Sequence, residues 1–134
     1  MYKDGLKSLE QVLTIYKKNY GEDHINTGLV LNSLGAAHLL MNNLAIVETL
    51  FNQALTILQK NEHPNSFISL EKLSELCIKR SIEENNKGNI QEMHGLKKQA
   101  IIYLEQALKV VQACLPEDSP HITRIKLKIQ DITI

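Results

Sequence analysis

The strongest constraint on this chain is a pair of apolar-periodic segments that meet at a polar break. Residues 31–55 read LNSLGAAHLLMNNLAIVETLFNQAL, and Asn42-Asn43 forms the break. The end of this stretch, FNQAL at residues 51–55, recurs as LEQVL at 9–13 and as LEQAL at 104–108. The first two copies start 42 residues apart. Two helices and two turns in a unit of this length predict a solenoid of helical hairpins.

The links between the segments repeat in the same register with a small deletion. GEDH at residues 21–24 corresponds to NEHP at 61–64, and EDSP at 117–120 is a third version. A capping or turn role is therefore expected for His24 and His63, which occupy equivalent positions.

Helical spacing of apolar residues predicts an all-α chain, because no window alternates apolar and polar residues over the length of a strand. Scarce Pro (3) and Gly (6) residues also favour helices. Gly21 is suited to end a helix in a left-handed conformation, and Pro64 and Pro120 are suited to first helical positions, with Ser119 as N-cap. Six helices are expected, at residues 2–20, 25–41, 44–60, 64–85, 90–114 and from 120 onward.

Charge and composition narrow the class of protein. Fifteen basic residues balance fifteen acidic ones, which argues against a nucleic-acid or membrane-surface binder. The apolar runs are too short to span a bilayer, and residues 1–11 lack the apolar core of a secretory signal. Cys77 and Cys114 lie in apolar helical contexts, so buried thiols in a reducing compartment are expected, with a disulfide as the alternative. The expected location is the cytoplasm.

The residues resemble the tetratricopeptide repeat family, and the 42-residue spacing and the links are most similar to its kinesin-light-chain-like subclass. Leu34-Gly35 matches the Leu-Gly pair of the family's first helix, while Phe51 and Ala54 match the aromatic and small positions of its second helix. Val47 and His38 depart from the usual Ala and Tyr. In the second repeat, Leu73-Ser74 stands for Leu-Gly, and the second helix is matched by Ala100, Leu104 and Ala107. The resemblance implies a right-handed superhelical solenoid of antiparallel helical hairpins.

Small side chains have a physical reason in such a fold. Two helix axes approach to about 8–10 Å only where little side chain lies between them. Gly35, Ala54 and Ala107 are expected at those close approaches. Replacing Ala54 by Leu should then overpack the hairpin and cost about 1–3 kcal/mol.

The second hairpin is longer than the first. From Gly35 to Asn42 is 7 residues, whereas from Ser74 to Gly88 is 14, and the following arm is lengthened equally. Equal insertions of about two helical turns keep the faces in phase, so a protruding hairpin is expected. In the lengthened part, the two helices are predicted to contact each other through Ile82, Ile90 and Met93, which we call the seam. The alternative is a flexible loop.

One domain, residues 1–134, is expected to contain four parts. They are a half repeat (1–21), a full repeat (22–60), an elongated repeat (61–115) and a terminal helix (116–134). The chain is either cut from a longer array or capped by its last helix. Self-association through the incomplete terminal repeats follows as a prediction.

Nothing in the sequence predicts catalysis, a metal site or a cofactor. The five histidines match no zinc-site spacing, and no phosphate-binding loop or nucleophile elbow is visible. His38 allows a minor alternative, a histidine phosphotransfer domain, against its interpretation as a histidine at the edge of the core. The basic cluster of Arg124, Lys126 and Lys128 is interpreted as a solvated face.

The predicted function is therefore protein–protein interaction. The resemblance implies that the first helix of each pair lines a concave groove that binds a peptide or helical segment of a partner, without nucleic acid or membrane. The alternative is a regulatory or sensor segment of a larger enzyme or signalling protein. By helical phase the groove should contain Leu29, Asn32, Ala36, Leu39, Asn43, Ile68, Glu71, Glu75 and Ile78.

Overall fold

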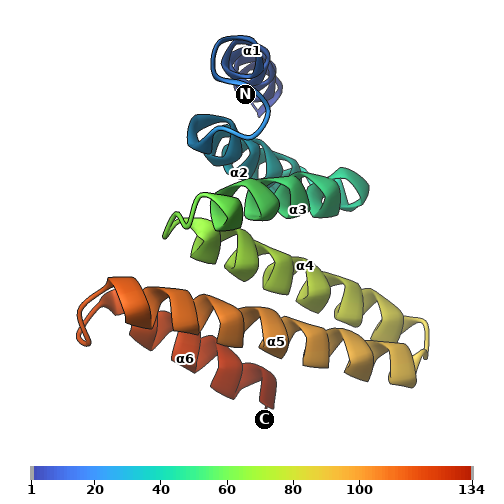
Figure 1. Cartoon of the computed structure of the whole chain (residues 1–134). Coiled ribbons are helices and arrows are strands. Elements are labelled where there is room, and N and C mark those ends of the chain that lie inside the picture. The colour runs from blue at the N-terminus through green and yellow to red at the C-terminus, as the bar shows by residue number, and fades with distance from the viewer. Residues whose placement is uncertain (1, 134) are drawn as a thin grey trace. The chain divides into compact units, whose positions relative to one another are not determined.

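The computed structural model describes residues 2–133, with side chains from residue 3, and every regular element in that range is a helix. Met1 and Ile134, the ends of the predicted domain, lie outside the described residues. The six helices confirm the predicted all-α fold (Figure 1). They are α1 (Tyr2–Tyr20), α2 (Ile25–Leu40), α3 (Leu44–Lys60), α4 (Ser66–Asn86), α5 (Ile90–Cys114) and α6 (Pro120–Thr133).

The chain divides into two compact units, residues 1–69 and 70–134, with the division inside α4. In the first unit α2 packs against both α1 and α3. Its core contains Leu31, Leu34, Leu50, Ala54 and Ile57, and Leu6, Leu9 and Leu13 of α1 pack against it.

In the first hairpin Gly35 lies directly against the ring of Phe51. A Cβ atom added to Gly35 would lie 2.9–3.0 Å from three ring atoms of Phe51, which is closer than Cβ atoms normally come to neighbours. Ala54 has no exposed surface. The prediction that small residues permit this approach is confirmed for the first hairpin.

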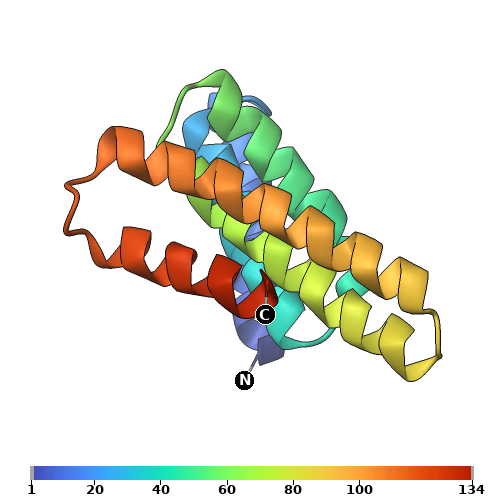
Figure 2. The same cartoon turned by 90° about the horizontal axis from the view of Figure 1, so that it is seen from below.

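In the second unit, α5 packs against α6. Figures 1 and 2 show α4 and α5 side by side, joined by a short turn. The buried residues on α5 are Ala100, Leu104, Ala107 and Val111, and those on α6 are Ile122 and Ile125. The two buried residues of α6 are three positions apart, so they lie on one face of the helix.

The two hairpin turns have the same backbone geometry. Asn42 and Gly88 both have positive φ, 61° and 84°. The next residue donates its N–H to a carbonyl five positions back, from Asn43 to His38 and from Asn89 to Glu84, at 2.9 Å in each case. This is the Schellman pattern of helix termination, and it supports the alignment of the two hairpins. Gly21 also has positive φ, as predicted.

The second hairpin is helical to its end, so the flexible-loop alternative is wrong. Helices α4 and α5 contain 21 and 25 residues, against 16 and 17 in α2 and α3. The predicted seam is only partly correct. Met93 is buried, but Ile82 and Ile90 are 56% and 48% exposed, and Ser81, next to Ile82, is buried instead.

Two further predictions need correction. The fourth helix starts at Ser66 and not at Pro64, because residues 63–66 form a turn in which the His63 carbonyl accepts a hydrogen bond from the Ser66 N–H. Cys77 is buried as predicted, but Cys114 is exposed because it ends α5.

The predicted capping residues are confirmed. His24 Nδ1 accepts from the Asn26 N–H at 3.0 Å, and His63 Nδ1 accepts from the Asn65 N–H at 3.1 Å. Ser119 Oγ accepts from the His121 N–H at 3.3 Å. These three links start first-type helices in the same way.

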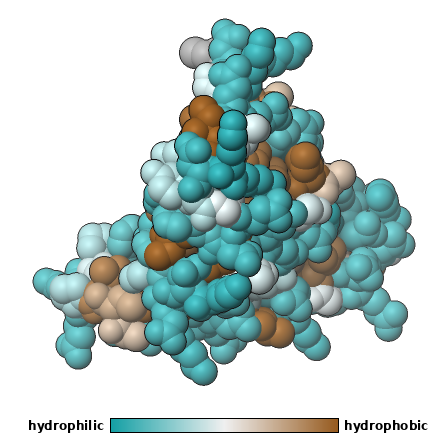
Figure 3. Space-filling model, turned by 45° about the horizontal axis from the view of Figure 1, so that its top comes forward, coloured by the Kyte–Doolittle hydropathy of each residue, from teal (hydrophilic) through white to brown (hydrophobic). Residues whose placement is uncertain are grey.

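The surface visible in Figure 3 is mostly hydrophilic, and hydrophobic residues form separate patches on it. Within residues 2–133, no helix combines the length and the apolar composition that crossing a bilayer requires.

Candidate functional site

Asn32, one of the predicted groove residues, is buried on α2 with 6% of its surface exposed. Its Oδ1 accepts a hydrogen bond from Ser69 Oγ at 2.6 Å. Its Nδ2 is also buried and has no hydrogen-bond acceptor among the described residues. A buried donor without an acceptor is costly, so it marks either local strain or a group that a ligand completes.

Three other predicted groove residues in the first unit lie near the end of α2. Leu39 is buried, Asn43 is exposed, and Ala36 is half-buried. Asn43 Nδ2 lies 3.2 Å from Nδ1 of His38, which is itself 8% exposed. This contact agrees with His38 being a histidine at the edge of the core.

The remaining apolar candidates are Leu29, Ile68 and Ile78, and all three are half-buried. Because Leu39 is buried, it does not form an exposed apolar patch with Leu29 and Ile78. The first-type helices therefore present partly covered side chains of mixed polarity.

Glu71 occupies in the second repeat the position that Asn32 occupies in the first, and it is the centre of an ion-pair cluster. Its side chain is 8% exposed and contacts two cations of α6. Arg124 donates to both carboxylate oxygens, and Lys128 Nζ lies 2.9 Å from Oε2. Glu75 adds contacts to Lys128 at 3.8 Å and to Lys72 at 3.5 Å. Two carboxylates thus face three cations.

The electrostatics of Glu71 follow from this geometry. Burial alone would raise its pKa by disfavouring the charged form. Hydrogen bonds from Arg124 and Lys128, together with their positive charges, outweigh burial and lower the pKa of Glu71 below its ordinary value. The carboxylate is therefore ionised at neutral pH and is engaged within the second unit.

Sequence reasoning missed this cluster. Arg124 and Lys128 were interpreted as a solvated face, which is wrong for these two residues because both bind Glu71. The available signal was their spacing of four residues on one helix, which places two cations on the same side. Lys126 is exposed, as that interpretation predicts.

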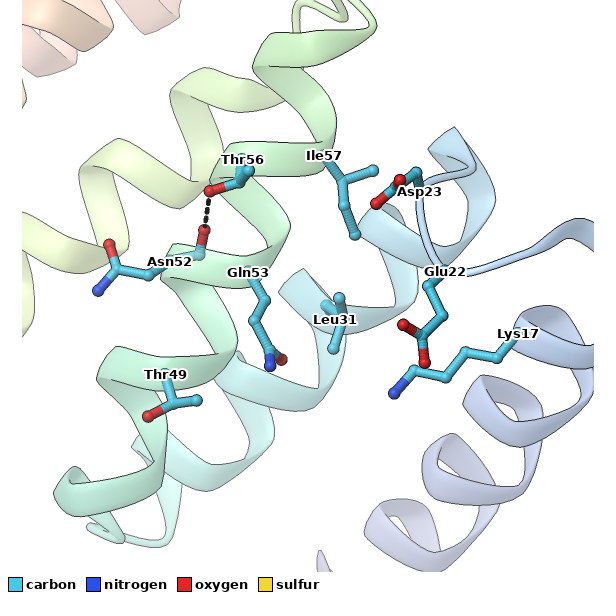
Figure 4. A pocket seen from close by; sticks show the side chains of 9 residues that line it. All are labelled: Lys17, Glu22, Asp23, Leu31, Thr49, Asn52, Gln53, Thr56 and Ile57. Carbon is cyan, nitrogen blue, oxygen red and sulfur yellow. Dashed lines mark hydrogen bonds between the residues drawn. The ribbon is translucent and has the colours of Figure 1, made fainter.

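A cleft of about 520 Å³ lies in the first unit between the end of α1 and the outer side of α3. Figure 4 shows Leu31 within it, with the side chains of Lys17 and Glu22 directed toward each other at one edge. Along α3 it is lined by polar side chains and Ile57, namely Thr49, Asn52, Gln53, Thr56 and Ile57. No predicted site residue lines it. Over residues 2–133, no three His, Cys, Asp or Glu side chains gather as a metal site would require.

Comparisons with known proteins match this geometry. Residues 1–60 match the family model described as "Tetratricopeptide repeat". Among solved structures, the chain is similar to the TPR-like repeats of a kinesin light chain protein described from Podosopora anserina. The TM-score is 0.53 and the identity is 17%, over 98% of this chain and 77% of that one. A variant of the same protein gives the same TM-score and identity over 76% of its length. No curated protein sequence matches the chain.

Proposed function

We propose that this chain, whose residues 1–60 match the tetratricopeptide repeat model, is a non-catalytic module that binds a peptide or helical segment of a partner protein. The family match over residues 1–60 and the shared fold support a role in protein–protein interaction in general. The exposed Cys114 thiol fits a reducing compartment, and we assign the protein to the cytoplasm.

The observation that carries the proposal is the Asn32 amide. Ser69 satisfies its oxygen, while its N–H donors lack an acceptor. A main-chain carbonyl of an extended peptide supplies the missing acceptor, and the terminal torsion of Asn is soft enough to turn the amide toward it. Leu29 and Ala36 lie on the same face of α2, one turn away on either side, and give the peptide apolar contacts.

In the second unit the proposed contacts come from the face of α4 that contains Glu75 and Ile78. Glu71 does not contact the partner in this proposal, because Arg124 and Lys128 already neutralise its charge. Its role is to position α6 against α4. The basic character expected of the partner is therefore opposite Glu75, which is half-buried, rather than opposite Glu71.

The test uses a display library of random peptides and the complete chain. We expect enriched peptides whose affinity falls about tenfold in Asn32→Leu, which corresponds to one lost hydrogen bond in a desolvated site. Ser33→Ala, an exposed neighbour on α2, is the matched control and should bind as the parent chain does. Amide chemical shifts should change along α2 when the peptide is added. Peptides that bind Asn32→Leu with unchanged affinity would refute the assignment of this face.

A further inference from the structure

Helix α3 has two sides with different surroundings. Its inward side is buried at four positions that α5, in the register of the FNQAL and LEQAL copies, buries as well. These are Val47, Phe51, Ala54 and Leu58 on α3 and Ala100, Leu104, Ala107 and Val111 on α5. The outer side of α3 forms one wall of the cleft of about 520 Å³ in the first unit (Figure 4). The residues of this outer side take no part in the core, so their chemistry can serve binding.

The polar residues with which α3 lines the cleft are all uncharged. They are Thr49, Asn52, Gln53 and Thr56, and all four are exposed. The aligned residues, also exposed, are Lys7, Glu10, Gln11 and Thr14 on α1 and Ile102, Glu105, Gln106 and Lys109 on α5. Each of those two helices has two charges at these positions, as is normal for a solvated helix face. The wall of the cleft is therefore distinguished from its repeats by its neutrality.

The floor of the cleft is apolar. It is lined by Leu31 of α2 and Ile57 of α3, which are 2% and 7% exposed. Figure 4 shows the side chain of Gln53 extending from α3 toward Leu31. An amide group thus borders an apolar surface, and this combination is typical of sites that bind a ligand with both polar and apolar groups.

The charged residues at the edge of the cleft compensate one another. Asp23 Oδ2 lies 3.2 Å from Lys60 Nζ. The side chains of Lys17 and Glu22 are directed toward each other. An anion would need an excess of cations, and a metal ion would need an excess of carboxylates. The charge balance therefore favours an uncharged ligand.

An extended peptide main chain is an uncharged ligand that fits the wall. From Thr49 to Thr56 the wall covers seven residues of α3, which is about 10 Å at the helical rise. About three residues of extended chain have this length. Their N–H and C=O groups match amide and hydroxyl side chains, which both donate and accept. A helical segment satisfies its own main chain, so it would leave this wall with side chains alone to bind.

The cleft is separate from the face of α2 that contains Asn32. Leu31 and Asn32 are neighbours in the sequence but point about 100° apart on the helix. Leu31 lines the cleft, whereas Asn32 is directed toward Ser69 of α4. The two places share no lining residue, so each can be tested without the other.

The second unit has a smaller cleft at aligned positions. The LEQVL and LEQAL copies start at residues 9 and 104. In that register Lys17, Glu22 and Leu31 align with residues that line a cleft of about 400 Å³, namely Gln112, Glu117 and Lys126. The repeat unit therefore forms a cleft at this place in both units. Because Lys126 replaces Leu31, the second cleft has a charge where the first has its apolar floor, and it serves as an internal control.

We propose that the cleft between α1 and α3 binds a short, uncharged, extended segment of a partner protein. One aliphatic side chain of that segment lies on Leu31 and Ile57. Gln53 binds the main chain beside it, and Thr49 and Thr56 contact the segment on either side. The first unit thus has a binding site on the outer side of α3.

A display library of random peptides tests the proposal. The library is selected on the complete chain with Asn32→Leu, because that substitution removes the other proposed site. Selected peptides should share an uncharged stretch with one aliphatic residue. Adding Gln53→Glu should raise their dissociation constants about tenfold, because it replaces a hydrogen-bond donor by a charge. Gln59→Glu on α3 and Gln112→Glu in the second cleft are the matched controls, and both should leave the dissociation constants unchanged.

A synthetic copy of a selected peptide tests the chemistry of the ligand. Methylation of the main-chain nitrogen of its aliphatic residue should weaken binding about tenfold, because it removes a donor. Lys17→Gln should change the dissociation constant less than about twofold, because the ligand is uncharged.

Three results would overturn the proposal. The first is a selection that enriches no peptide, or peptides that bind Gln53→Glu as well as they bind the chain without it. The second is a tenfold loss of affinity in Lys17→Gln, which would indicate an anionic ligand. The third is tighter binding when residues around the aliphatic one are replaced by Ala, a helix former, which would indicate a helical ligand.

Discussion

The hairpin of α2 and α3 and the hairpin of α4 and α5 bury the same four positions of their second helices but fill one equivalent position of their first helices differently. The first hairpin has Asn32 there, with one hydrogen bond to Ser69 and a donor left over. The second has Glu71, whose two oxygens are bound by Arg124 and Lys128. In both cases the side chain reaches the next first-type helix. The same position therefore holds a buried donor without an acceptor in one repeat and an internal ion pair in the other.

The close approach inside each hairpin differs as well. Gly35 faces the ring of Phe51 in the first, whereas Ser74 and Leu104 occupy the aligned positions in the second. Ser74 is 2% exposed, and its Oγ donates to the Glu71 carbonyl at 2.7 Å. Compared with the first hairpin, the second thus has a larger side chain on its first helix (Ser74 for Gly35) and a smaller one on its second helix (Leu104 for Phe51).

The largest expected effect comes from the positions that the hairpins share. Ala54→Leu and Ala107→Leu should each lower the free energy of unfolding by about 3 kcal/mol, because both sites are fully enclosed and cannot take three more carbon atoms without strain. Chemical denaturation measures the loss. Val12→Leu, at the aligned but open position of α1, is the control and should change little. Similar losses at all three positions would break the repeat alignment.

The next effect separates the two hairpins. Gly35→Ala should destabilise by about 2 kcal/mol, since the added methyl group meets the Phe51 ring, and this outweighs the usual gain of replacing a helical Gly. Ser74→Ala should cost less than about 1 kcal/mol, because it removes one hydroxyl hydrogen bond. Adding Phe51→Leu to Gly35→Ala should recover part of the lost stability. The double variant would pair a larger residue on the first helix with a smaller one on the second, as Ser74 and Leu104 do in the second hairpin. A stabilised Gly35→Ala chain would contradict the close approach.

The Glu71 cluster should make stability depend on pH. The folded-state pKa of Glu71 is lowered, so its contribution is present above the unfolded-state pKa and is lost as pH falls through the folded-state value. Glu71→Gln should cost about 1–2 kcal/mol at neutral pH and progressively less below about pH 4. Solvent screening keeps this cost in unfolding free energy small, since the Arg124 and Lys128 side chains are 39% and 33% exposed. Unfolding free energies measured from pH 7 to pH 3 check this, with Glu75→Gln as control.

Periodicity and turn chemistry predicted the helices because they act over a few residues. Gly21, the Asn42 break and the His24 link each determine a local backbone conformation that the sequence displays directly. The site was harder to predict. Whether Glu71 faces solvent depends on Arg124, 53 residues away, and helical phase contains no information about that distance. Ile82 was misplaced for a related reason: its apolar character predicts burial, yet the adjacent Ser81 occupies the buried position.

The smallest effect on stability is expected at Asn32, and it is the most informative about function. Leu has the same branched shape as Asn, with methyl groups in place of the amide oxygen and nitrogen. Asn32→Leu therefore removes a buried donor that has no acceptor, while it also deprives Ser69 of its acceptor. These two changes oppose each other, and the net change in unfolding free energy should stay below about 1 kcal/mol. Glu71→Gln should exceed it, because there the charged partners lose a carboxylate. If Asn32→Leu instead costs as much as Glu71→Gln, then Asn32 is a structural tie like Glu71, and the first hairpin loses its distinction as the one that keeps a donor available.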